Sequence, residues 1–297
     1  MIRIIFLFIT LLANTSLFSA EIQCSHPNFE WQVLSPGVEW TKLDINFTPF
    51  DHEQKVWTTD LNRKVTLRIL KLDLNLASLQ FMKFNSSVQC NPETDRFIKN
   101  LLDTSADKNI AAINASFFDM NNSNVLGLAY DRNNLWADNL NTLKSNSSAV
   151  FVIKNNIPQM IDKDDFTKVY GDVVTAEKLQ EFSLAVQAYP RLLRDDQIIV
   201  SQNVLNSRRP RTAIGFRAED KIIYLVTIDA RGENDTTGMT LYEFGHFLQN
   251  SSCGINLKTA LNLDGGGSTS FAIPSQNIYE QADRCRPLGN ILTIKSL

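Results

Sequence analysis

Alternation of apolar and polar residues predicts a chain built mainly from strands. The segments GVEWTKLDINF (residues 37–47) and KVTLRILKLDL (64–74) both alternate, and the second slips out of phase near Leu70. The polar stretch between them, 51–62, is typical of a loop. The further predicted strands are IAAINASFFDM (110–120, running into a turn), AVFVI (149–153), SLAVQAYPRLL (183–193, with a strand end at Gln187), the hairpin pair RRPRTAIGF (208–216) and KIIYLVTID (221–229), ALNLD (260–264) and NILTIKSL (290–297).

Helical periodicity is confined to three segments. CNPETDRFIKNLLDTS (90–105) reads as a helix from its fifth residue, and residues 175–186 are also expected to be helical. TLYEFGHFLQN (240–250) is a third helix, in which Thr240 as N-cap and Glu243 three residues later form a capping box. Strands outnumber helices and no repeat or Pro-rich linker intervenes. The pattern therefore predicts a single mixed α+β domain with strand-rich sheets and a few packed helices.

The segment 121–148 is rich in Asn, Ser and Asp, which is typical of loops. A short apolar element, 125–130, is expected within it.

The composition is that of an ordinary globular protein. The chain has 297 residues, of which 43% are hydrophobic and 21% charged. A net charge of −3 argues against binding to nucleic acid, which requires a basic face. The three histidines are scattered and there is no CxxC motif, which argues against a zinc site.

The first twenty residues resemble a secretory signal peptide. Arg3 precedes the apolar run IIFLFITLLA, and the segment ends on Ser19 and Ala20. The run is short for a membrane span, although an uncleaved N-terminal anchor is the alternative. No later segment is long and apolar enough for a membrane helix. Residues 21–297 are therefore expected to be secreted or periplasmic, without stable insertion into a membrane.

An even number of cysteines in an exported protein predicts disulfide bonds. The four are Cys24, Cys90, Cys253 and Cys285, which allow three pairings. The pairing Cys24–Cys90 with Cys253–Cys285 is favoured, because each bond then lies within one half of the chain.

The segment LNLDGGGSTS (261–270) is the most distinctive in the chain. Asp264 stands at the end of an apolar strand, before three glycines. Backbone N–H groups without side chains can curl into a nest that binds phosphate or a developing oxyanion. The alternative is a tight turn in which Asp264 bonds to its own backbone. The candidate phosphate ligands here are Gly265, Gly266, Gly267, Ser268 and Thr269.

Other strand exits carry further candidates. Asn114 and Asp119 flank two phenylalanines in INASFFD, an arrangement that suits a sugar ring beside an aromatic wall. Asp229 and Arg231 end the strand in TIDARG, and Arg211 precedes the apolar AIGF. Arginine suits phosphate because its guanidinium offers two donors in one plane. Each arginine alone could equally be a solvated surface charge.

Taken together, these segments resemble the phosphodiester glycosidase family. The matching pieces are INASFFD, QAYPRLL, RRPRTAIGF, IDARG, GMTLYEFGHFL, ALNLDGGGSTS and RPLGNILTI, within a motif-bearing core of residues 105–297. The resemblance implies a secreted hydrolase that cleaves the glycosidic bond of a sugar-1-phosphodiester, of the N-acetylglucosamine-1-phosphodiester kind, and releases the free sugar. The substrate would be a sugar-phosphodiester glycan or small molecule.

On this hypothesis Asp264 is the catalytic carboxylate, and Asp119 or Asp229 is its partner. Asn114, Arg211, Arg231 and the glycine nest would hold the sugar and its phosphate. No cofactor is expected, although the acidic loop 229–235 could hold Ca²⁺. Two rival functions are a metal-assisted phosphodiesterase that uses the same three aspartates, and a non-catalytic module that binds cell-wall carbohydrate.

Overall fold

A computed structural model was used for the structure. It describes residues 21–25, 29–84, 97–103, 108–132, 134–143, 145–203, 207–217, 220–229, 238–283 and 285–297. The predicted signal segment and Arg231 lie outside the described residues, as do residues 230–235 of the predicted calcium loop. Within the described ranges, none of the helices is long and apolar enough to cross a membrane.

The described strands form three large antiparallel sheets and one small one. The first sheet has the order β1 (Gln32–Ser35), β2 (Val38–Phe47), β5 (Arg63–Asp73), β16 (Ile222–Asp229), β15 (Arg211–Phe216), β17 (Thr259–Asn262), β13 (Arg191–Arg194) and β14 (Gln197–Ile198). The second has the order β11 (Ile157–Asp162), β10 (Ala149–Lys154), β12 (Leu184–Ala188), β8 (Gly127–Asp131) and β9 (Asn134–Asn139). The third has the order β19 (Ile278–Gln281), β18 (Ser270–Ile273), β7 (Ala111–Asn114), β20 (Asn290–Ser296) and β6 (Ala77–Lys83). The small sheet pairs β3 (Phe50–Asp51) with β4 (Val56–Trp57).

One central hydrophobic core joins the three large sheets. It includes Trp40 and Leu72 from the first sheet, Phe151 from the second and Phe271 from the third. The ring centroids of Trp40 and Phe271 lie 5.7 Å apart, across two sheets. Because all three sheets bury side chains in one core, the chain forms a single mixed α+β domain, as the sequence predicts.

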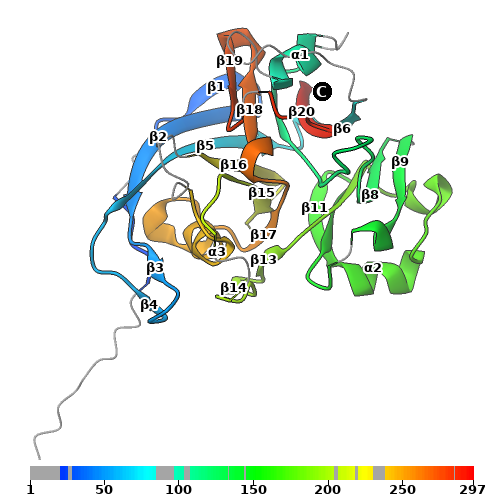
Figure 1. Ribbon diagram of the computed structural model, residues 1–297. Helices are drawn as coiled ribbons and strands as arrows, with labels where there is room; N and C mark the ends of the chain where they lie inside the picture. Colours follow the sequence, from blue (N-terminus) through cyan, green and yellow to red (C-terminus); the bar gives the residue numbers. More distant parts are fainter. Residues whose placement is uncertain are drawn as a thin grey trace, which may run out of the picture.

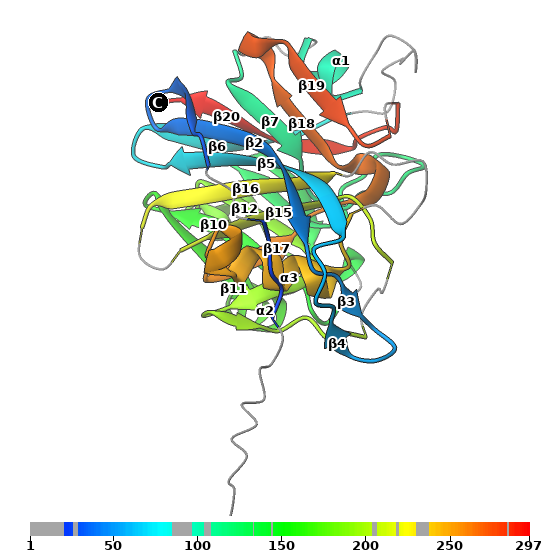
Figure 2. The same cartoon turned by 90° about the vertical axis from the view of Figure 1, so that its left-hand side faces the viewer.

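Each described α-helix covers the outer face of one sheet (Figures 1 and 2). Phe244 and Phe247 pack on the first sheet, Phe166 on the second and Ile98 on the third. Without these helices the outer sheet faces would expose apolar side chains to water. The helices are α1 (Phe97–Asp103), α2 (Lys163–Tyr170) and α3 (Leu241–Gln249), and the 3-10 segments are η1 (Leu140–Thr142), η2 (Ala176–Leu179), η3 (Ser251–Cys253), η4 (Gly266–Ser268) and η5 (Pro274–Gln276).

The slip in the pattern of β5 has a structural reason. Leu67 and Ile69 face the core beneath α3, whereas Leu70 and Leu72 face the central core. The strand is buried on both faces where it passes from one core to the other, so strict alternation fails near Leu70.

The capping box of α3 is also confirmed, with Thr240 and Glu243 bonded reciprocally.

Some predicted elements are wrong or missing. The expected helix at 175–186 is a single 3-10 turn followed by β12, because pairing with β10 and β8 fixes residues 184–188 as a central strand. The segment 121–148 holds the apolar strand β8 as expected, but also β9. The sequence pattern does not predict β9, because it lies at a sheet edge and its three apolar residues are consecutive rather than alternating with polar ones.

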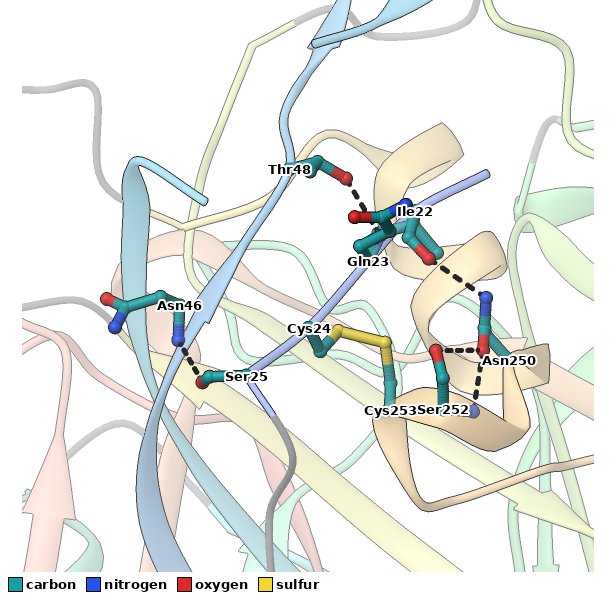
Figure 3. The surroundings of a disulfide bond; sticks show 9 residues. All are labelled: Ile22, Gln23, Cys24, Ser25, Asn46, Thr48, Asn250, Ser252 and Cys253. Atoms are coloured by element: carbon teal, nitrogen blue, oxygen red, sulfur yellow. Dashed lines mark hydrogen bonds between the residues drawn. A yellow bond between two sulfur atoms is a disulfide. The ribbon is translucent and has the colours of Figure 1, made fainter. Parts of the chain in front are cut away.

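The disulfide Cys24–Cys253 contradicts the favoured pairing. Cys24 lies beside the end of β2, where it forms a bridge with Phe47, and η3 brings Cys253 to the same place. Figure 3 shows this bond together with the side chain of Asn250, which donates to the Ile22 carbonyl over 2.9 Å. Proximity in the fold, rather than in sequence, therefore decides the pairing. Cys285 is also disulfide-bonded, and Cys90 lies outside the described residues.

We expect the double variant Cys24→Ser, Cys253→Ser to unfold more easily than the wild type. The bond joins residues 229 positions apart, so it removes much conformational entropy from the unfolded chain. The expected loss in the free energy of unfolding is about 2–4 kcal/mol. Urea denaturation under non-reducing conditions measures it, and an unchanged midpoint would show that the bond contributes nothing to stability.

Candidate active site

A cavity of about 140 Å³ opens beside Asp264. Strands β15 and β17 run antiparallel with Ala213 opposite Asn262. The first residue of β15 and the last residue of β17 therefore lie at the same end of these two strands. This register brings together two sequence-predicted residues, Arg211 and Asp264. The residues that line the cavity are Phe117, Tyr189, Pro190, Arg211, Leu241, Asn262, Asp264 and Gly265.

The Asp264 side chain is half-buried at the wall of the cavity. Its burial raises the pKa of the carboxyl, while hydrogen bonds from the Ser268 hydroxyl and the Gly265 N–H, together with the charge of Arg286, oppose this shift. The Gly265 N–H donates to Oδ1 over 2.9 Å. A carboxyl group with a raised pKa in a cavity is typical of an acid or base catalyst.

Asn114 is hydrogen-bonded to the backbone of Asp264. It is 1% exposed, and its amide donates to the Asp264 carbonyl oxygen over 2.6 Å. Its Oδ1 accepts from the Thr212 hydroxyl (2.8 Å) and from the Ser270 N–H (3.0 Å). These bonds join β7, β15 and β18 to the segment that follows β17. The structure therefore places Asn114 as a positioning residue for Asp264, outside the lining of the cavity.

We expect Asn114→Ala to lose both stability and activity. It leaves the Thr212 hydroxyl, the Ser270 N–H and the Asp264 carbonyl without a partner in a buried place, at a cost of about 2–4 kcal/mol. Denaturant unfolding and an activity assay measure the two losses. Asn46→Ala is the matched control, since Asn46 is exposed and should change neither quantity.

The glycine segment forms a tight turn. Gly266 has φ +60°, and a Cβ on Gly267 would lie 2.7 Å from Cδ of Arg286, so both positions favour glycine. The Gly266 N–H donates to the Pro210 carbonyl over 2.8 Å, and the N–H groups of Ser268 and Thr269 donate to carbonyls within the turn. A phosphate would compete with these internal bonds for the N–H groups. The phosphate nest stays a prediction.

Arg211 is a buried cation on the wall of the cavity. It is 7% exposed, and its guanidinium donates to the carbonyls of Met239 (2.9 Å) and Ser207 (2.8 Å). Among the described residues, no carboxylate forms an ion pair with it. Burial, and then the charge of Arg209, lower the pKa of Arg211 to about 10, so it is cationic at neutral pH. A buried cation without a paired carboxylate favours the binding of an anion.

Asn262 and Tyr189 are not among the site residues that the sequence predicts, whereas Phe117 belongs to the predicted aromatic wall. Asn262 is 4% exposed and donates to the Tyr189 carbonyl over 2.8 Å, while its Oδ1 has no hydrogen-bond partner among the residues that the structure describes. An orphan acceptor on a cavity wall suits a substrate hydroxyl. The sequence could have indicated Asn262, because it stands two positions before Asp264 and residues two apart in an extended segment point to the same side. The ring centroids of Phe117 and Tyr189 lie 4.5 Å apart and form the aromatic wall.

Arg286 was also missed. Its Nε donates to the Ser268 hydroxyl oxygen over 3.1 Å, and Ser268 in turn donates to Asp264. The arginine therefore acts on the carboxyl group through Ser268. Its position at the start of the segment RPLGN, far along the chain, gave no indication of this contact.

The other predicted carboxylates lie outside this cavity. Asp119 closes a turn, where Asn121 donates twice to Oδ1 (2.8 and 3.1 Å) and Asn122 donates to Oδ2 (3.1 Å). Asp229 ends β16 and lines a separate cavity of about 10 Å³ with Thr269. The described residues contain no cluster of three or more His, Cys, Asp or Glu side chains that could hold a metal ion.

A model of the phosphodiester glycosidase family matches residues 107–295, which is more than half of the chain. The chain belongs to the phosphodiester glycosidase family. The match includes Asn114, Arg211, Asn262 and Asp264, so the cavity lies within the family's region of the chain.

One curated relative in the family is N-acetylglucosamine-1-phosphodiester alpha-N-acetylglucosaminidase of Mus musculus. It is 30% identical over 82 residues, which are 28% of this chain and 14% of the mouse protein. The chain thus matches only a small part of that relative's length.

Solved structures share the fold. The catalytic domain of the zebrafish N-acetylglucosamine-1-phosphodiester alpha-N-acetylglucosaminidase, auto-inhibited by its pro-peptide, matches with a TM-score of 0.61 and 18% identity over 93% of this chain and 88% of that one. A hypothetical protein from Synechocystis matches with a TM-score of 0.56 and 16% identity, covering 90% and 64%. A putative exported protein from Burkholderia pseudomallei matches with 0.54 and 11%, covering 92% and 96%. At these identities the matches establish the fold alone.

Proposed function

We propose that the protein hydrolyses the glycosidic bond of a sugar-1-phosphodiester in the Asp264 cavity and releases the free sugar. The observation that carries this proposal is that one cavity within the family's region is lined by a half-buried carboxyl group with a raised pKa and by a buried cation that pairs with no described carboxylate. In a sugar joined to phosphate, the phosphate would meet the cation of Arg211 and the sugar would meet the carboxyl group of Asp264. Family membership and the curated relative's name support the same reaction.

The phosphate and the sugar on either side of the broken bond need different kinds of stabilisation. When the C1–O bond breaks, its electron pair passes to the phosphate oxygen, and the leaving phosphate monoester needs little protonation. The Arg211 charge would stabilise that negative charge. The sugar carbon becomes cationic, and a carboxylate at Asp264 would stabilise it or take the proton of the attacking water. The products are free sugar and a phosphate monoester.

The other wall residues fit the sugar. The orphan Oδ1 of Asn262 would accept a hydrogen bond from a hydroxyl, and the Phe117–Tyr189 pair would pack against the ring. The cavity is smaller than the usual range of about 300–1,000 Å³ for ligand sites. It would therefore receive the reacting end of the substrate, and the remainder would extend outside.

The place of action follows from the same proposal. The Cys24–Cys253 disulfide fits an oxidising compartment, and a structural neighbour bears the name of an exported protein. The predicted signal peptide supports the same conclusion. We propose that the protein acts after secretion or in a periplasm.

A panel of sugar-1-phosphodiesters that differ in sugar and aglycone tests the reaction. The products of each are separated and identified, with and without EDTA. Free sugar plus a phosphomonoester on the aglycone supports the proposal. Sugar-1-phosphate, formed in an EDTA-sensitive reaction, would indicate the rival phosphodiesterase. Binding without turnover across the panel would indicate a non-catalytic module.

A further inference from the structure

A second, larger cavity lies along α3. Its volume is about 470 Å³, within the range of ligand sites, and it shares no lining residue with the Asp264 cavity. Among its lining residues are Trp57, Tyr242, His246, Gln249, Asn250 and Asn256.

The sequence of α3 explains why these side chains meet. Tyr242, His246 and Gln249 are four and then three positions apart, so they lie on one face of the helix. The opposite face, which includes Phe244 and Phe247, packs into the core. The half-buried face with Tyr242 is therefore the wall of the cavity.

Trp57 completes an aromatic wall. It comes from β4, and its ring lies nearly parallel to Tyr242, with a centroid distance of 5.9 Å and an interplanar angle of 17°. It meets the His246 ring edge-on at 5.0 Å. The ring of Tyr242 also contacts His246 at 4.4 Å. These contacts fix the three rings relative to one another.

The polar atoms of these rings have no hydrogen-bond partner in the part of the chain that the structure describes. The Tyr242 hydroxyl, the Trp57 indole N–H and the His246 ring nitrogens form no hydrogen bond with the described residues. Burial lowers the pKa of His246 to about 4 and raises that of Tyr242, so both are neutral at neutral pH. Nearby His52, by contrast, has Nδ1 bonded to the Gln202 carbonyl at 2.8 Å. The wall thus offers neutral donors and acceptors to a ligand.

The charges of the lining limit the class of ligand. No lysine or arginine is among the described lining residues, which disfavours phosphate and other anions. Of the two acidic residues, Asp196 is neutralised by an ion pair with Lys258. The carboxylate of Glu21 is the remaining charge, and the other polar groups include amides and hydroxyls, such as those of Asn256 and Ser251. Neutral donors and acceptors in this number match the hydroxyl groups of a sugar.

From these observations we propose that the cavity along α3 is a second carbohydrate site, which binds a neutral sugar unit through Tyr242, His246 and the surrounding amides. Leu241 lines the Asp264 cavity and Tyr242 the second, so both cavities lie near the start of α3. A sugar bound there would add affinity for a longer glycan without taking part in the chemistry. The site does not depend on the proposed hydrolase activity.

Titration calorimetry of the full protein with neutral trisaccharides tests this site. The probes are cellotriose, maltotriose and tri-N-acetylchitotriose, with choline and inorganic phosphate as charged comparisons. We expect saturable binding of at least one trisaccharide and of neither charged probe. Tyr242→Phe, which removes only a hydroxyl, should weaken that binding about 3–10-fold, and His246→Ala should weaken it at least as much.

The Asp264→Asn variant separates the two sites. It should bind the trisaccharide as tightly as the wild type, while Tyr242→Phe should turn over a small sugar phosphodiester at the wild-type rate. The proposal is overturned if no trisaccharide binds, if a charged probe binds in its place, or if Tyr242→Phe and His246→Ala bind as the wild type does. Loss of trisaccharide binding in Asp264→Asn would equally overturn it, by placing the sugar in the other cavity.

Discussion

Replacement of Asp264 by asparagine is expected to lower turnover by about 10²–10⁴-fold, the usual contribution of an acid–base group. The amide keeps the size of the carboxyl group and can still accept the Gly265 N–H, so the fold should be unchanged. It cannot transfer a proton or stabilise a cationic carbon. Steady-state kinetics on the best substrate of the panel measures the loss, and near-wild-type turnover in the folded variant would remove Asp264 from the mechanism.

The same variant should be at least as stable as the wild type at neutral pH. Burial raises the folded-state pKa of Asp264, so this group favours the folded state below the ordinary pKa of 3.8, and that contribution is lost as the pH rises through the raised pKa. Above it, the wild type holds a poorly solvated charge that asparagine lacks. The gain should therefore shrink as the pH falls towards 3.8.

Asp44→Asn is the matched control for both effects. Asp44 is exposed, and hydrogen bonds from Lys64 and Thr66 lower the pKa of its carboxyl, which is the opposite shift. Its replacement should leave turnover unchanged and should not stabilise the protein. A stability profile of Asp264→Asn that follows that of Asp44→Asn would contradict the buried state of the Asp264 carboxyl group.

Arg211→Met should lower kcat/KM by about 10²–10³-fold, the loss typical of a group that stabilises developing charge. Methionine fills similar space but carries no charge to meet the phosphate. Stability should change little, because relief of a buried charge offsets the loss of hydrogen bonds to Met239 and Ser207. Kinetics and denaturant unfolding on the same preparation measure the two quantities.

Arg191→Met provides the contrast. Arg191 is also buried, but it is paired with Asp162 over 2.9 Å and lines a different cavity. Its loss should destabilise the fold by about 1–3 kcal/mol, since Arg194 still contacts Asp162, and should leave the kinetics of the folded protein unchanged. If Arg211→Met leaves kcat/KM unchanged, Arg211 has no role in binding or turnover.

The sequence predicts the strand framework and the chemistry at single strand ends, because both are local properties. Asp264 at the end of an apolar strand and Arg211 at the start of another can be identified in this way. Their convergence depends on the register of β15 with β17, which no local pattern records. Asp229 shows that a position at a strand end is not enough to predict a site residue. It ends the neighbouring strand β16, but together with Thr227 it lines a different cavity, on the face of the strand opposite Ile228.

Long-range contacts explain the remaining differences. The pairing of Cys24 with Cys253 and the contact of Arg286 with Ser268 both join segments that only the complete fold brings together. Asn262 could have been predicted from the sequence, because it stands two positions before Asp264 and so points to the same side of the chain. The structure adds that the residue lines the cavity and that its Oδ1 has no hydrogen-bond partner among the described residues.

Hydrolysis of a reactive sugar-1-phosphodiester in ¹⁸O-labelled water tests the central claim most directly. Mass spectrometry locates the label in the products, and Asp264→Asn under the same conditions gives the background. The account predicts that the label enters the free sugar at C1 and that the phosphate monoester stays unlabelled. Label in the phosphate, accompanied by sugar-1-phosphate or an unlabelled sugar, would show cleavage of the P–O bond and contradict the proposed glycosidase.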